Sequence, residues 1–248
     1  REIPSSGRFG GNDGDRNRHD SQSRSRNCII KEGEMNEKLT IPKTAKTRGR
    51  IAPVRLAHIV FKTPQFKAMV DWWCTVLEAK PAMSNDNLAF LTYDEEHHRV
   101  AIVNMPTLLP TTTLMRGLDH IAFTYASLSD LLATWKRLDG LGIKPVWCTN
   151  HGPTTSIYYA DPDGNKAELQ VENFDTPEEI LAWSANSDFE TNPIGVDFEP
   201  TELYQRLESG EPESALKQRP VIGPRGVASI PREMVGSFNK LLARFAGK

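Results

Sequence analysis

The chain has 248 residues and a formal net charge of −2, so no overall field favours nucleic acid or an anionic membrane as a partner. No apolar run approaches the roughly 18 residues of a membrane span. The three cysteines are widely spaced and odd in number, which does not fit a disulfide framework. We therefore expect a cytoplasmic protein in a reducing compartment.

The first 50 residues differ from the rest in composition. They are rich in Gly, Ser, Asn, Asp and Arg, and carry 12 Lys and Arg against 7 Asp and Glu, whereas the remainder carries 18 against 25. Such a segment buries too little apolar surface to offset its ordering entropy, so we expect a disordered basic tail over 1–50. The chain begins at Arg1, and we interpret it as a fragment or as carrying a mis-called start, with Met35 as the alternative start.

A βαβββ pattern begins after the tail. Residues 55–63 alternate and are β-rich, which predicts a strand. Residues 66–79 carry an apolar stripe at helical spacing. Three further strand-like runs follow at 80–84, 87–93 and 99–105.

The same pattern then occurs a second time. A strand is predicted over 117–125, a helix over 128–142, and three more strands over 144–150, 154–160 and 166–172. An offset of 62 residues places His58 on His120, Phe61 on Phe123 and Trp73 on Trp135. An internal repeat decides the fold class, so we expect an α+β domain over 51–175, in which paired βαβββ modules form a cleft-like open barrel.

Residues 176–248 predict a helical and coil extension. A helix is expected over 174–186, where Thr176 and Pro177 are suited to its first positions. We expect a loop over 191–200, a short helix over 201–210 and a final amphipathic helix over 234–245.

Three residues form a candidate metal site. His58, His120 and Glu168 each lie in an extended run, and two imidazoles with one carboxylate leave one side of a ferrous ion open to substrate and dioxygen. A single His on a strand is more often structural than a ligand. Here two of them occupy the same position of a repeat, and Glu168 lies on the last strand of the second module, which is next to the first strand in this arrangement.

Residues 54–173 resemble the vicinal oxygen chelate superfamily, which includes glyoxalases, bleomycin-resistance proteins and dioxygenases. They are most similar to its type I extradiol ring-cleavage dioxygenases. The stretch HGPTTSIYYADPDGNKAEL resembles the family signature, and EEHHRVAI resembles the segment with the acid/base histidine. The resemblance implies His58, His120 and Glu168 as metal ligands. It also implies catalytic roles for three further residues, namely His98, His151 and Tyr158.

The function that this resemblance implies is cleavage of a catechol-type ring beside two vicinal hydroxyls. The metal would be Fe(II), with Mn(II) as the alternative, and the substrates a small aromatic diol and O₂. Tyr158 and His151 would orient and deprotonate the diol, and His98 would serve as acid and base. Trp147 is a candidate for an aromatic-binding wall. Because a single module pair offers limited core, we also expect a homo-oligomer.

Two other classes share this fold, so the fold alone does not decide the function. A glyoxalase-like isomerase or lyase needs a fourth protein ligand on the last strand of the first module, where RVAIVNM has no acid. A non-catalytic binding or accessory protein would have no reason to keep the full set of His58, His120, Glu168, His98 and Tyr158.

Overall fold

The computed structural model describes residues 53, 55–109, 117–186 and 189–234. Every element named below belongs to one compact unit, Arg55–Lys248. The tail predicted over 1–50 lies outside the described residues, and so does nearly all of the helix predicted over 234–245.

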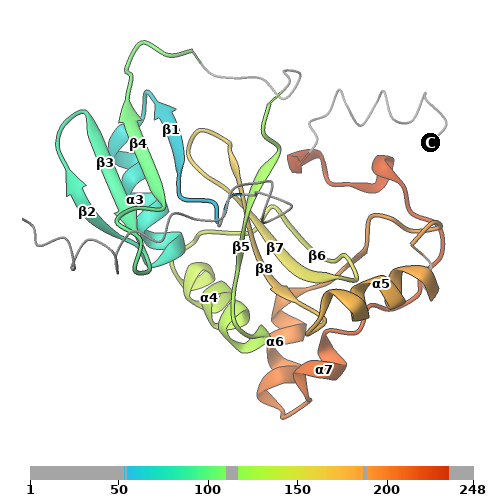
Figure 1. The fold of residues 1–248 in the computed structure, drawn as a ribbon. Coiled ribbons are helices and arrows are strands. Elements are labelled where there is room, and N and C mark those ends of the chain that lie inside the picture. Colours follow the sequence, from blue (N-terminus) through green and yellow to red (C-terminus); the bar gives the residue numbers. More distant parts are fainter. Residues whose placement is uncertain (1–52, 54, 110–116, 187–188, 235–248) are drawn as a thin grey trace, which may run out of the picture. The chain divides into compact units, whose positions relative to one another are not determined.

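The first module has the predicted βαβββ order (Figure 1). Its elements are β1 (Ile59–Thr63), α3 (Phe66–Leu77), β2 (Lys80–Ser84), β3 (Leu88–Thr92) and β4 (Val100–Asn104). They form a four-stranded sheet in the order β1-β4-β3-β2. Only β1 and β4 run parallel, because the helix carries the chain back before the two antiparallel hairpins begin.

The second module repeats this topology. Its elements are β5 (His120–Thr124), α4 (Leu128–Gly140), β6 (Trp147–Asn150), β7 (Thr154–Ala160) and β8 (Lys166–Glu172), in the sheet order β5-β8-β7-β6. A fifth strand, β9 (Val196–Asp197), pairs with β6. The loop expected over 191–200 was therefore wrong at these two residues. The described strands form two separate sheets, which confirms the predicted open arrangement of paired modules.

Equivalent apolar residues on the two helices build the two cores. Helix α3 buries Met69 and Trp73 in the core of the first sheet, and α4 buries Leu131, Trp135 and Leu138 in the core of the second, which Val76 of α3 also joins. Both sets follow the i, i+4, i+7 spacing of one helix face, and the offset of 62 relates them residue by residue. Burying each such side chain stabilises the fold by about 1.5–3 kcal/mol, so the repeat seen in the sequence is a repeat of packing.

The C-terminal extension docks on the second module. It contains α5 (Pro177–Asn186), α6 (Pro200–Glu208), α7 (Glu213–Leu216) and the 3₁₀ turn η1 (Val227–Ser229). Glu213 accepts hydrogen bonds from the amides of Leu128 and Ser129, which are free at the start of α4. Within the described part of the chain, no helix combines the length and apolar composition that crossing a membrane requires.

A tight turn at Asp161–Gly164 connects β7 to β8 and contacts the first module. The buried Asp161 carboxylate accepts hydrogen bonds from the amides of Asp163 and Asn165 at 3.0 and 2.9 Å. It also accepts one from the Trp73 indole N–H, at 3.2 Å, across the module boundary. One carboxylate thus fixes both the turn before β8 and the position of that turn on α3.

Asp161→Ala should lower the free energy of unfolding by about 2–3 kcal/mol, because it leaves the buried Trp73 N–H and the turn amides without an acceptor. Urea denaturation measures the loss. Asp163→Ala is the matched control in the same turn, since its partly exposed side chain accepts a hydrogen bond from the exposed Gln65 side chain and not from a buried group of the described residues. An equal loss in the two variants would contradict this role of Asp161.

Candidate active site

The register of the second sheet places a row of residues across one face. Ala122 pairs with Glu168, Glu168 with Tyr158, and Tyr158 with Trp147. Directly paired residues point to the same side of a sheet, so these four side chains share a face. Their sequence neighbours, including Ile157, Tyr159 and Leu169, pack on the other face in the core that α4 covers.

His120 lies on the same face as this row and contacts its central carboxylate. It precedes Ala122 by two residues, so its side chain points the same way. Its Nε2 lies 3.0 Å from Oε2 of Glu168, and its Nδ1 lies 2.7 Å from Oδ2 of Asp119. The imidazole is thus held between a buried carboxylate and an exposed one.

The electrostatics of the pair follow from this contact. The hydrogen bond to Glu168 raises the pKa of His120 to about 9, with a further contribution from Asp119 and against the effect of burial. For Glu168, burial raises the pKa, but hydrogen bonds, chiefly the one from His120, outweigh it and leave the pKa below its usual value. The carboxylate is therefore ionised and, near neutral pH, holds a proton on His120.

The same pair fits two neighbouring ligands of one metal ion. Two donor atoms that bind an ion at about 2.1 Å and at right angles lie about 3 Å apart, as Nε2 of His120 and Oε2 of Glu168 do. Metal-binding histidines commonly donate their other ring N–H to a carboxylate, which is the place that Asp119 takes. The donor chemistry at this point therefore suits a cation.

Tyr158 and His151 form the next part of the site. His151 Nδ1 is in hydrogen-bond contact with the carbonyl of Ile194, which can only accept, so this nitrogen carries a proton. Burial lowers the pKa of His151, so the ring is neutral near pH 7 and its Nε2, which carries no proton, can accept a hydrogen bond. That Nε2 lies 2.9 Å from the Tyr158 hydroxyl. Burial and the charge of Glu168 raise the pKa of Tyr158, so the phenol keeps its proton and can donate it.

A close contact fixes the loop that carries His151. Gly152 adopts φ +105°, and a Cβ built there would lie 2.1 Å from the Trp183 indole of α5. Arg219 packs over the Trp183 ring and donates to the carbonyl of His151 at 3.0 Å. The extension thus contacts the main chain at the His151 carbonyl and at Gly152.

The remaining predicted residues, His58 and His98, lie in the first module. His58 directly precedes β1 and is exposed, so the strand expected over 55–63 begins one residue after it. Its ring contacts that of His98, with centroids 4.4 Å apart, and His98 also contacts Phe90. Burial, followed by the neighbouring His58 and His97, lowers the pKa of His98.

The structure does not bring the three predicted ligands together. Among the residues it describes, no three His, Cys, Asp or Glu side chains are close enough to hold one metal ion. Phe61 of β1 and Phe123 of β5 both contact Trp73 of the core. Side chains alternate between the two faces of a strand, and His58 and His120 each lie three residues before one of these Phe residues. The two His positions therefore belong to the faces of their sheets that point away from Trp73. His120 and Glu168 are in contact, and the participation of His58 stays a prediction.

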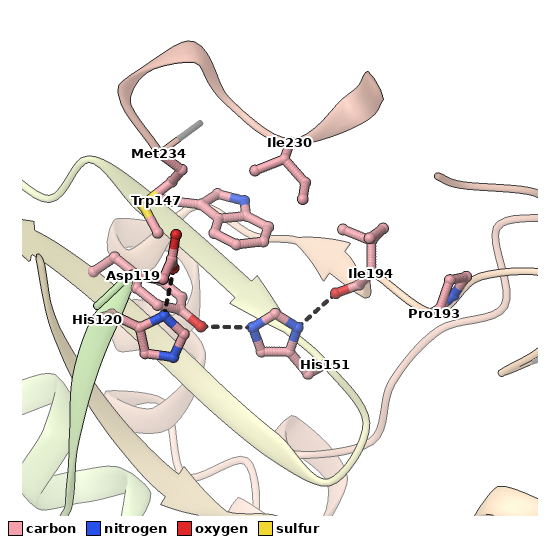
Figure 2. A pocket seen from close by; sticks show the side chains of 9 residues that line it. Asp119, His120, Trp147, His151, Pro193, Ile194, Ile230 and Met234 are labelled. Atoms are coloured by element: carbon pink, nitrogen blue, oxygen red, sulfur yellow. Dashed lines mark hydrogen bonds and ion pairs between the residues drawn. The ribbon is translucent and has the colours of Figure 1, made fainter. Parts of the chain in front are cut away.

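A cavity of about 200 Å³ opens beside these groups (Figure 2). Asp119, His120, His151, Tyr158 and Trp147 line it from the module, and Pro193, Ile194, Ile230 and Met234 line it from the extension.

Trp147 was expected as an aromatic wall, and its ring stacks on Tyr158, with the ring centroids 5.1 Å apart. The sequence reasoning missed Asp119, although its place directly before His120 was a usable signal. It also missed the extension residues, which no motif marks.

The strand pairing also identifies the position in the first module that corresponds to Glu168. Glu168 pairs with Ala122, and the repeat places Ala122 on Val60. Val60 pairs with Ala101. A methyl group thus stands where a fourth, acidic ligand would have to be, as the sequence of β4 predicted.

Comparison with known proteins identifies the family of this chain. The family model of the Glyoxalase/Bleomycin resistance protein/Dioxygenase superfamily matches residues 55–169. Biphenyl-2,3-diol 1,2-dioxygenase 2 of Rhodococcus globerulus is 45% identical over 162 residues, which are 65% of this chain and 85% of that protein. Biphenyl-2,3-diol 1,2-dioxygenase 3 of the same organism is 44% identical over 167 residues, which are 66% and 88%. The chain therefore belongs to this superfamily, as its repeat and signature predicted.

Gly152→Ala should destabilise the protein by at least about 2 kcal/mol, because the added methyl group meets Trp183 and the backbone is in the left-handed region. Gly164→Ala separates the two effects. That residue also has a positive φ, of +87°, but has open space around its Cβ position, so about 1 kcal/mol is expected. Thermal or urea unfolding compares them, and equal losses would show that the Trp183 contact does not constrain the His151 loop.

Proposed function

We propose that this protein is an Fe(II)-dependent extradiol dioxygenase that inserts both atoms of O₂ into a catechol-type ring. The observation that carries the proposal is the His120–Glu168 pair, 3.0 Å apart, of which His120 lines a cavity together with Tyr158 and His151. The relatives' name describes cleavage between carbons 1 and 2, beside the hydroxylated carbons 2 and 3 and not between them. That regiochemistry is extradiol cleavage.

His120 and Glu168 would hold the metal, with His58 as the third ligand. Fe(II), or Mn(II) in its place, would bind both diol oxygens and give access to O₂ by redox chemistry, which Zn²⁺ does not have. The position of Glu168 supports this assignment, because its buried carboxylate lies beside His120, whose proton a metal ion would replace.

Tyr158 and His151 provide a route for a proton from the diol. Nε2 of the neutral His151 ring accepts the hydrogen bond of the Tyr158 hydroxyl, so that hydroxyl can accept one from a diol in the cavity. As the diol proton moves to the Tyr158 oxygen, the phenolic proton moves to Nε2 of His151. The carbonyl of Ile194 keeps the His151 tautomer that this transfer requires.

His98 is the candidate acid and base for the later proton transfers. Its lowered pKa leaves the ring neutral near pH 7, so it can take a proton and return it. It contacts His58, so the proposed third ligand and the proposed acid/base come from the same module. The indole of Trp147 and the apolar residues of the extension exclude water from the ring-binding side.

The glyoxalase-like alternative is not supported, because Ala101 occupies the place of the fourth ligand. A pure binding protein would gain nothing from a tautomer-fixed His151 hydrogen-bonded to Tyr158. Self-association and a cytoplasmic location stay predictions.

The proposal is tested by O₂ uptake. Anaerobically purified protein is loaded with Fe(II) and given a panel of catechols, including biphenyl-2,3-diol. It should consume O₂ and form a yellow ring-opened product, and His120→Ala should lower turnover by at least about 100-fold, because it removes a ligand. Absence of uptake with every diol, or full activity in His120→Ala, would sink the proposal.

His98→Phe should keep iron and diol binding but lower turnover by about 100-fold or more, since general acid–base catalysis contributes about that much. Equilibrium binding of the diol under anaerobic conditions and steady-state kinetics separate the two effects. His97→Phe is the matched control, because that ring is adjacent and exposed and has no proposed role. Unchanged turnover in His98→Phe would remove its assigned role.

A further inference from the structure

The apolar side of the cavity comes from a part of the chain outside the repeat. Pro193 and Ile194 belong to the loop before β9, and Ile230 and Met234 belong to the C-terminal strap, defined as residues 219–234. In Figure 2, Ile230 and Met234 reach the cavity from the strap, opposite His120 and His151 on the sheet. A diol with its hydroxyls at His120 and Tyr158 would therefore direct a ring substituent toward the strap.

One buried cation connects the strap to this loop. The Arg225 side chain is only 9% exposed, and its guanidinium binds both carboxylate oxygens of Asp197, at 2.8 and 2.5 Å. It also donates to the carbonyl of Gly195 at 3.0 Å and to the hydroxyl of Ser229 at 2.8 Å. Bidentate, charge-assisted bonds are the strong and directional ones, so this contact fixes geometry as well as adding energy.

Both of the groups held by Arg225 lead to the candidate site. Asp197 accepts from the Trp147 indole N–H at 2.7 Å, and the Trp147 ring stacks on Tyr158. Gly195 follows Ile194, whose carbonyl binds His151. A Cβ at Gly195 would lie 2.5 Å from the Asn150 carbonyl, so this loop is seated closely against the end of β6.

We propose that Arg225 is a positioning residue for the substrate pocket. It holds Trp147 through Asp197 and holds the loop that binds His151 through Gly195. By fixing this wall, Arg225 determines that the pocket accepts a diol with a large apolar substituent. This inference rests on the proposed function. Removing the guanidinium frees the strap that carries Ile230 and the indole that faces it. Within the described residues, neither His120, on the hydroxyl side of the cavity, nor its partner Glu168 makes a hydrogen bond or ion pair to Arg225, so both keep their own partners.

The test compares two substrates, catechol and biphenyl-2,3-diol, in Fe(II)-loaded full-length protein. Arg225→Ala should lower kcat/KM for biphenyl-2,3-diol by about tenfold or more relative to catechol, mainly through KM, because the substituent loses its wall. Arg225→Lys should not restore the ratio, since an ammonium group cannot make the bidentate contact. Arg206→Ala should leave the ratio unchanged, because it breaks only the bidentate pair between Arg206 of α6 and Glu211, outside the cavity.

Trp147→Phe supplies a second variant in case Arg225→Ala does not fold. It keeps a ring in the wall but loses the N–H bond to Asp197, so it should shift the ratio in the same direction. Combined with Arg225→Ala, it should add less than its separate effect, because both act on one network. An unchanged ratio in folded Arg225→Ala, or an equal loss with both diols, overturns the inference. If the unaltered protein turns over neither diol, the proposed function fails first, and this inference falls with it.

Discussion

The register of the second sheet is the constraint on which the site depends. Side chains alternate between two faces, so a slip of one residue in β8 would move Glu168 into the core beneath α4 and Leu169 into the cavity. The turn at Asp161 immediately before β8 sets this register, and its carboxylate is in turn bonded to Trp73 of the first module. A structural acid with no role in the chemistry thus determines which way the candidate ligand points.

The buried Glu168 carboxylate explains the charges around it. An ionised group with 4% exposure is costly unless it is paired, and here His120 and Ser156 bond to it. In the metal-free protein the pairing proton resides on His120, whose pKa is raised to about 9. Metal binding would replace that proton with a cation, so the same placement of His120 and Glu168 suits both the metal-free and the metal-bound protein.

Much of the fold could be predicted from the sequence because the repeat is one of packing. Trp73 and Trp135 are buried in equivalent places, and the topology around them is the same. The contact of His120 with Glu168 was also predictable, since the first and last strands of a module are neighbours. The wall formed by Ile194, Ile230 and Met234 was not, because tertiary contacts hold it and no local pattern records them. The absence of an acid equivalent to Glu168 was also predictable, because residues 99–105 contain no acid, and the observed pairing of Val60 with Ala101 identifies the equivalent residue.

We propose that His120 and Glu168 hold iron. The most direct test is metal analysis of the protein purified without added metal, alongside Glu168→Ala prepared in the same way. Stoichiometric iron in the unaltered protein, lost in the variant while the fold is retained, is the predicted result. Zinc or nickel in place of iron, or iron retained in full by Glu168→Ala, would contradict the account.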